Sequence, residues 1–129
     1  MLGTFQQSHL RIEVEASEAA IRDSLMRPEQ FQRWMFPQQF SPGLPDQLQV
    51  GTVFTSRLGP VAVRHHVQTI TSNGLCLLMN QGIDGCHRWS WGDGWVQSCL
   101  EGVSLLPLNL GQTLSLIRLR EFLKNPPQT

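Results

Sequence analysis

Histidines and cysteines are the side chains of this sequence best suited to bind a metal ion or to act as nucleophiles. His65 and His66 are adjacent, as are Cys86 and His87. Both pairs fall in segments with strand patterns, where neighbouring side chains point to opposite faces of a sheet. Neither pair can therefore chelate one metal ion. The three cysteines lack the close spacing of a zinc site or a disulfide framework, so we expect buried apolar roles for Cys76, Cys86 and Cys99.

His65 is the side chain best placed for a role in a pocket. Val61, Val63, His65 and Val67 alternate with their neighbours along the predicted strand. His65 is therefore expected on the same strand face as the three valines. One interpretation is a hydrogen-bonded histidine of the core or its rim. The others are a polar contact for a ligand inside a pocket, or a general acid/base.

Tryptophans surround one predicted hairpin. Trp89 and Trp91 share a strand face, whereas Trp95 is expected on the opposite face. Core packing and the lining of a ligand pocket both fit large side chains of this kind. Glu101 is an acidic residue in the middle of a predicted strand, and it is either solvated on the outer face or a buried general base.

Composition and charge exclude several classes of protein. The 129 residues fit a single domain over 1–129, with a frayed tail at 125–129. Hydrophobic residues make up 40% of the chain, and ten basic side chains balance ten acidic ones. A charge-driven disordered chain and a basic nucleic-acid or membrane surface are therefore not expected. The absence of a long apolar run, a signal-like start and paired cysteines predicts a cytoplasmic protein.

The first third of the chain predicts one strand, two short helices and a loop. Residues 8–16 alternate as a half-buried strand, and Ser17 is suited to cap a helix. Pro28 interrupts this helix and can begin a second one that ends near Met35. Prolines and a glycine exclude regular structure over residues 36–50, which we expect to be either a cover over the core edge or a lid over a pocket.

Strands joined by tight turns follow, over residues 53–58, 61–67, 75–80, 86–91 and 95–105, with a turn predicted at 82–85. If Gly59-Pro60 is a two-residue loop, Phe54 lies opposite His65. The Asp93-Gly94 hairpin in the same way places Trp91 opposite Val96, Trp89 opposite Ser98, and His87 opposite Leu100.

A long helix is predicted over residues 108–124. One apolar stripe of this helix consists of Leu108, Leu116, Leu119 and Leu123. A second stripe, on roughly the opposite side, consists of Leu110, Leu114 and Ile117. A helix with two apolar sides must bury both or expose one to a partner, so the second stripe, if exposed, predicts a homodimer surface.

In order and in local motifs the chain resembles the START-like helix-grip superfamily, also called SRPBCC, which includes polyketide cyclase and dehydrase-like proteins. The resemblance covers about residues 7 to 125 and rests on residues 12–17 with Ala20-Ile21, on 27–34, 50–52 and 89–94, and on 116–124. It implies an α+β fold in which a curved antiparallel sheet wraps around the C-terminal helix. It also implies a hydrophobic pocket between this helix and the sheet.

We therefore predict that the chain binds a small hydrophobic ligand and has no nucleic-acid partner, no membrane span, no metal and no cofactor. The predicted wall of the pocket consists of Phe54, Val63, His65, Met79, Trp89, Leu116 and Leu119. Two alternatives stay open. One is an enzyme of cyclase or dehydratase type that uses His65, and the other is an oligomeric interaction module without a ligand.

Overall fold

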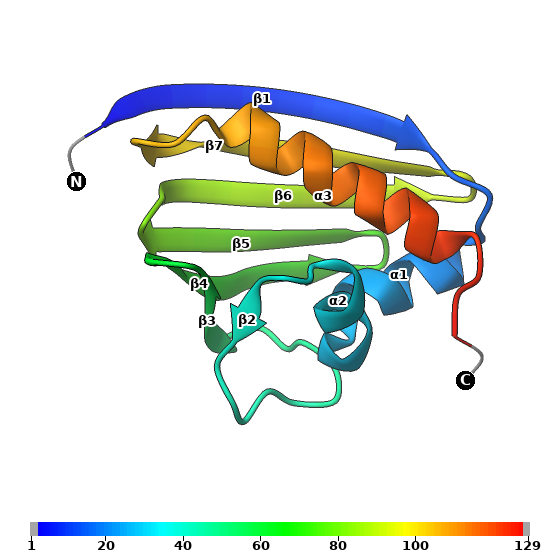
Figure 1. Cartoon of the computed structure of the whole chain (residues 1–129). Coiled ribbons are helices and arrows are strands. Elements are labelled where there is room, and N and C mark those ends of the chain that lie inside the picture. Colours follow the sequence, from blue (N-terminus) through cyan, green and yellow to red (C-terminus); the bar gives the residue numbers. More distant parts are fainter. Residues whose placement is uncertain (1–2, 128–129) are drawn as a thin grey trace.

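A computed structural model describes residues 3–127 and shows an α+β fold (Figure 1). Seven antiparallel strands form one curved sheet in the order β1-β7-β6-β5-β4-β3-β2. The strands are β1 (Thr4–Glu13), β2 (Gln39–Phe40), β3 (Val53–Leu58), β4 (Val61–Thr71), β5 (Gly74–Gln81), β6 (Asp84–Gly92) and β7 (Trp95–Ser104). The helices are α1 (Glu18–Met26), α2 (Pro28–Trp34) and α3 (Leu108–Leu123). All three helices lie on one side of the sheet, with α3 crossing it and α1 and α2 at one end (Figure 1).

The two short helices begin and end as the sequence predicts. The hydroxyl of Ser17 accepts a hydrogen bond from the backbone N–H of Ala20 at 3.2 Å and so caps α1. Arg27 has extended backbone angles, which separate α1 from α2, and Pro28 occupies the first turn of α2. Trp34, at the end of α2, donates a hydrogen bond from its indole to the carbonyl of Ser24 at 2.9 Å, which ties the two helices together.

Two tight turns set the register of the sheet. The predicted pairings of Trp91 with Val96, Trp89 with Ser98, and His87 with Leu100 are confirmed. The pairing of Phe54 with His65 is confirmed as well. Because side chains alternate along a strand, these pairings place His65, His87 and Trp89 on the face that the helices cover. Trp95 lies on the opposite face, where the guanidinium of Arg11 stacks 4.3 Å from its ring centroid.

Several predicted boundaries were wrong. The first strand spans 4–13 instead of 8–16, because residues 4–7 pair with β7 through their backbone although they are mostly polar. The chain leaves the ladder after the backbone N–H of Val14 bonds to the carbonyl of Gly94. Residues 36–50 contain the short strand β2, which pairs with Arg57 and Ser56 of β3. The last strand ends at Ser104 and the final helix at Leu123.

The predicted turn over residues 82–85 was also wrong in part, because Asp84 and Gly85 belong to β6. Gly85 pairs with Gly102 of β7, and a Cβ atom there would lie 2.0 Å from the carbonyl oxygen of Glu101. Only glycine allows this close approach of two strands. Of the predicted frayed tail, residues 128–129 lie outside the described residues, and residues 125–127 form no helix or strand.

The core lies between the sheet and the helices. The inner stripe of α3 is buried as predicted, with Leu108, Leu116, Leu119 and Leu123 all at most 4% exposed. The second stripe of α3 faces solvent. Leu110, Leu114 and Ile117 are between 44% and 58% exposed. Within residues 3–127, no helix has the length and apolar character needed to cross a membrane.

Candidate functional site

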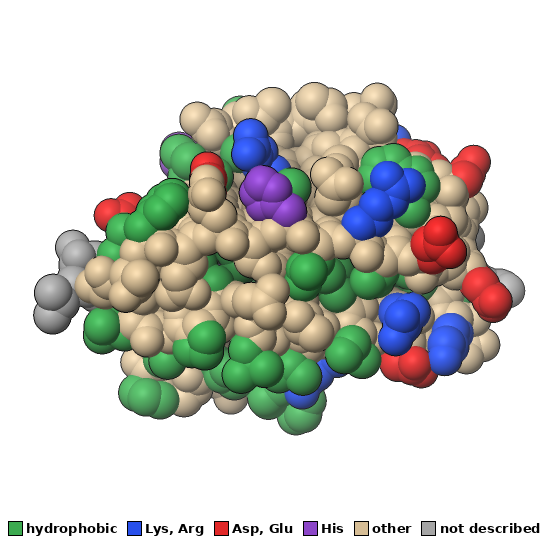
Figure 2. All heavy atoms as spheres, turned by 90° about the horizontal axis from the view of Figure 1, so that it is seen from above, with side chains coloured by type: hydrophobic (Ala, Val, Ile, Leu, Met, Phe, Trp, Pro, Cys, Tyr) green, Lys and Arg blue, Asp and Glu red, His purple; other side chains and the backbone are tan. Residues whose placement is uncertain are grey.

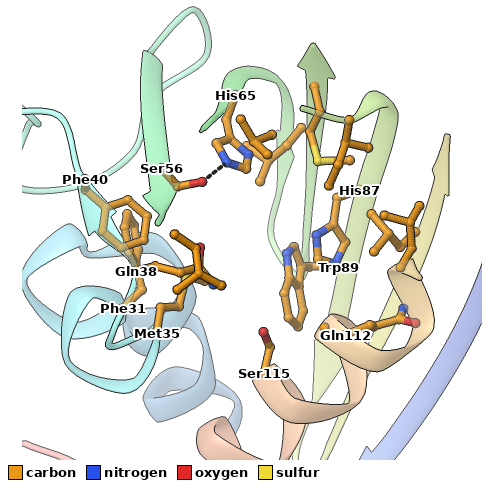
Figure 3. Close-up of a pocket in the computed structure, with 18 of the residues that line it drawn as sticks. Phe31, Met35, Gln38, Phe40, Ser56, His65, His87, Trp89, Gln112 and Ser115 are labelled. Atoms are coloured by element: carbon orange, nitrogen blue, oxygen red, sulfur yellow. Dashed lines mark hydrogen bonds between the residues drawn. The ribbon is translucent and has the colours of Figure 1, made fainter. Parts of the chain in front are cut away.

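A cavity of about 260 Å³ lies between the sheet, the first half of α3, α2 and the loop that follows α2 (Figure 3). Its wall is mostly aliphatic and aromatic. Polar side chains at the wall come from several elements and are Gln38, Ser56, His65, His87, Gln112 and Ser115. No Asp, Glu, Lys or Arg among the described residues lines it. The cavity therefore offers an apolar, uncharged interior with a few hydrogen-bonding groups.

Five of the seven residues predicted for the pocket wall line this cavity: Phe54, Val63, His65, Met79 and Trp89. Leu116 and Leu119 do not. They are buried in the core cluster that also contains residues of α1 and α2. The wall contributed by α3 is formed one to two turns earlier, by Leu108, Gly111, Gln112 and Ser115. The two short helices pack against the second half of α3 and fill the space beside it. The cavity therefore lies between the sheet and the first half of α3.

The loop over residues 36–50 closes one side of the cavity. Phe40 and Leu48 belong to the wall, and Leu44 packs against the core. Phe40 also contacts the ring of Phe31, with centroids 5.2 Å apart. Phe36 points outward and is 71% exposed. The loop thus packs on the core edge, as one interpretation predicted, and it also contributes to the cavity wall.

His65 is held at the wall by one hydrogen bond and one stacking contact. Its Nε2 atom lies 2.8 Å from the hydroxyl of Ser56, and its ring stacks on Phe54 with centroids 4.8 Å apart. Its Nδ1 atom is buried without a hydrogen-bond partner. Burial lowers the pKa of His65 to about 4, so the ring is neutral near pH 7.

His87 is the second histidine of the cavity, and its pairing repeats that of His65. Its Nε2 atom lies 2.6 Å from the hydroxyl of Ser98, and its ring stacks on Trp89 with centroids 4.4 Å apart. Burial, and next the nearby His65, lower the pKa of His87 to about 3. Figure 3 shows both imidazoles at the cavity, His65 beside Ser56 and His87 beside Trp89.

Gln112 joins this polar group from α3. Its amide nitrogen donates to the carbonyl oxygens of Ser8 and Ser98, each at 3.0 Å, and lies 2.9 Å from the hydroxyl of Ser98. These contacts fix the helix against β1 and β7. Its amide oxygen is buried without a hydrogen-bond partner.

His87 and Gln112 line the cavity although neither was predicted for the pocket wall. The signal for His87 was present, since it has the same strand parity as Trp89 and lies opposite Leu100 in the predicted register. The signal for Gln112 was a polar residue one turn after Leu108 and one turn before Leu116, inside the buried stripe. A polar group at such a position needs a buried hydrogen-bond partner.

Glu101 and Cys86 lie together on the outer face of the sheet. The carboxylate of Glu101 accepts hydrogen bonds from Gln7 at 3.0 Å and from the thiol of Cys86 at 3.4 Å, and these bonds lower its pKa. The hypothesis of a buried general base at Glu101 was therefore wrong. Burial, followed by Glu101, raises the pKa of the Cys86 thiol, which disfavours a thiolate nucleophile. Cys76 and Cys99 are half-buried free cysteines, and His66 is exposed on this outer face.

Comparison with known proteins shows which fold the chain has but assigns it to no family. No family model matches the sequence, and no curated protein matches it. A protein from Chromobacterium violaceum has a similar solved structure, with a TM-score of 0.72 and 13% identity over 95% of this chain and 99% of that one. DynU16, from the dynemicin biosynthetic locus, gives a TM-score of 0.72 and 13% identity over 92% of this chain and 47% of its own.

The solution structure of the Aha1 dimer from Colwellia psychrerythraea is similar as well. Its TM-score is 0.70, with 15% identity over 93% of this chain and 97% of that chain. At these identities the likeness concerns the arrangement of the sheet and helices alone. That arrangement is compatible with a helix-grip fold.

Proposed function

We propose that this chain is a START-like helix-grip domain that binds a small hydrophobic molecule between α3 and the sheet. The observation that carries the proposal is the cavity of about 260 Å³ with a mostly apolar wall and no charged lining residue among those described. Ligand pockets in proteins are typically lined in this way, with a few placed polar groups, and start at about 300 Å³. The volume lies just below this range, so the cavity suits only a small ligand.

A variant that fills the cavity tests this proposal. Ser115 lies on α3 at the cavity wall (Figure 3), so Ser115→Trp places an indole in the hollow. Arg118→Trp adds the same side chain at an exposed position of the same helix and serves as the matched control. We expect uptake of an environment-sensitive apolar fluorophore by the original chain and by Arg118→Trp, and its loss in Ser115→Trp. Equal uptake by both variants, or none by the original chain, would show that the cavity is not a binding site.

A cyclase- or dehydratase-type reaction with His65 as acid/base is the alternative use of the same cavity. Its wall holds two histidines but no carboxylate, cysteine or lysine among the described residues, and burial lowers the pKa of both histidines. A neutral imidazole at neutral pH is a weak general acid, and its low pKa also makes it a weak base. Binding without chemistry is therefore favoured. His65→Ala tests the alternative: it would have to abolish a measured turnover while the melting temperature stays nearly unchanged.

A second copy of the chain is proposed as the partner of the outer stripe of α3. Leu110, Leu114 and Ile117 stay exposed along this helix. Figure 2 shows hydrophobic side chains gathered along the edge of the view on which α3 lies, while charged side chains gather towards one end of the molecule. The structurally similar Colwellia protein is a dimer.

Sedimentation velocity at high micromolar concentration tests this partner. We expect a dimer for the original chain and a monomer when Leu110, Leu114 and Ile117 are all replaced by Gln. A monomeric original chain would contradict the proposal.

A further inference from the structure

The hydrogen bonds of Gln112 determine which way its amide points. Its Nε2 atom lies 3.0 Å from two backbone carbonyl oxygens, those of Ser8 and Ser98. Carbonyl oxygens only accept hydrogen bonds, so the group that faces them must be the NH₂. The same nitrogen lies 2.9 Å from the hydroxyl oxygen of Ser98. An amide nitrogen does not accept hydrogen bonds, so Ser98 cannot donate its hydroxyl hydrogen to Gln112.

The hydroxyl of Ser98 consequently determines the tautomer of His87. Ser98 is fully buried, and an unpaired hydroxyl there would be unfavourable. The acceptor available to its hydrogen is Nε2 of His87, at 2.6 Å. Nε2 is then the unprotonated nitrogen, and a neutral imidazole carries its hydrogen on Nδ1. The ring is neutral near pH 7 because burial lowers the pKa of His87 to about 3.

The Nδ1–H group of His87 is free to bind a ligand. Within residues 3–127, no hydrogen bond involves Nδ1 of His87, and this atom is not completely buried. The same holds for the indole N–H of Trp89, whose ring stacks on that of His87. Figure 3 shows the two rings side by side at the cavity. The cavity thus presents two neighbouring hydrogen-bond donors from β6.

The surroundings of these donors favour an uncharged acceptor. No Lys or Arg lines the cavity within the described residues, so a bound carboxylate would lose its hydration without gaining an opposite charge. A carbonyl oxygen accepts hydrogen bonds from neutral donors at a much smaller desolvation cost. The rest of the wall is aliphatic and aromatic and suits an apolar body.

We infer that the cavity selects a neutral, mostly apolar molecule with a carbonyl oxygen, and that Nδ1–H of His87 donates a hydrogen bond to this oxygen. The inference rests on the proposed binding function and adds the chemical class of the ligand. An apolar cavity of about 150 Å³ binds benzene, so one of 260 Å³ suits a molecule of about ten non-hydrogen atoms.

Three probes of about ten non-hydrogen atoms each test the class of ligand. Propiophenone carries a ketone, sec-butylbenzene carries a methyl group in place of the ketone oxygen, and phenylacetate carries a carboxylate. Their affinities are measured near pH 7.5 by displacement of the apolar fluorophore. We expect phenylacetate to bind at least about tenfold more weakly than propiophenone, because its charge has no partner in the cavity. A carboxylate that binds as tightly as the ketone would overturn the inference.

A paired substitution tests the role of His87 without leaving an unpaired group. His87→Leu combined with Ser98→Ala removes donor and acceptor together, and Gln112 keeps its two carbonyl partners. We expect propiophenone to bind about two- to tenfold more weakly to this variant, as the loss of one hydrogen bond predicts, while sec-butylbenzene is unaffected. His66→Leu, on the outer face, is the matched control and should change neither affinity.

Nitrogen NMR of the histidine side chains gives a readout that is independent of affinity. We expect the Nδ1–H tautomer at His87, with a shift of its Nδ1 resonance when propiophenone binds and no shift at His66. An Nε2–H tautomer, or equal weakening of both neutral probes in the paired variant, would refute the inference while leaving the binding function intact. If none of the probes and no fluorophore binds, the proposed function itself fails.

Discussion

Acidification from about pH 7.5 to about pH 5 is expected to destabilise this protein through His65 and His87. Both side chains have an ordinary pKa of 6.5 in the unfolded chain, whereas the folded values are about 4 and about 3. Between these limits the unfolded chain binds protons that the folded chain does not. The stability that the two neutral histidines contribute is therefore fully present above pH 6.5, and it decreases as the pH falls from 6.5 towards their pKa values in the folded protein.

The size of the effect follows from the two shifts. At pH 5 a histidine of the unfolded chain is mostly protonated, whereas one with a pKa near 4 or below in the folded protein is mostly neutral. This difference lowers the free energy of unfolding by about 2 kcal/mol for each of the two histidines. Together, His65 and His87 account for up to about 4 kcal/mol. That is a large part of the total stability of about 5–15 kcal/mol that a typical domain has.

Urea denaturation at the two pH values measures this loss directly, with fluorescence of the buried tryptophans as the signal. We expect the free energy of unfolding of the original chain to drop by about 2–4 kcal/mol at the lower pH. The paired variant His87→Leu/Ser98→Ala should lose about half of this pH dependence, and His66→Leu should keep all of it. Glu101 interferes little, since its lowered pKa contributes stability that is lost only as the pH falls below about its ordinary value of 4.5.

An unchanged free energy of unfolding between the two pH values would refute this reasoning. The same is true if the paired variant keeps the full dependence, because the titrating groups would then lie elsewhere. Either result would mean that the cavity is wetter than the packing around His87 and Trp89 indicates.

Further substitutions test the packing that surrounds the cavity. Leu119→Ala removes a fully buried side chain and should lower the free energy of unfolding by about 2–5 kcal/mol in urea denaturation, whereas Arg118→Ala, at an exposed position of α3, should change it by less than about 0.5 kcal/mol. Equal effects would contradict the assigned faces of the helix. Ser17→Ala removes the cap of α1 and should cost about 1 kcal/mol, with Ser17→Asp restoring it. Gly111→Ala has open space for its Cβ atom and should raise the melting temperature through a gain of about 0.5–1 kcal/mol; a decrease would show that the cavity needs the glycine.

The hairpins explain why so much of the sheet could be predicted from the sequence. The Asp93-Gly94 turn allows one register for β6 and β7. Once one pair of residues is fixed, alternation along the strands determines the face on which each remaining side chain lies. The inner face could therefore be assigned to His65 and Trp89 from turn chemistry and strand parity alone. The short strand β2 could not be predicted, because two residues of an edge strand carry no periodic pattern.

The position of the cavity along α3 could not be predicted, because the inner stripe is continuous. Leu108 at its start and Leu119 near its end are equally buried and equally apolar in pattern. What decides between them is the place of α1 and α2, whose side chains fill the second half of the groove. Neither the pattern of α3 nor that of the strands contains this information. The link from Gln112 through Ser98 to His87 likewise joins elements that only the tertiary structure brings together.

The bonds between β1 and α3 have a consequence for how the protein folds during synthesis. The backbone N–H of Leu108 donates to the side chain of Gln6, and the amide of Asn109 donates to Ser8, across separations of 102 and 101 residues. The first strand can pair with β7 before the final helix is synthesised, but these bonds, and the cover that α3 gives to the sheet, form only afterwards. Until then the sheet exposes the part of its apolar inner face that α3 covers in the folded protein. Folding that depends on contacts between residues so distant in the sequence is slow.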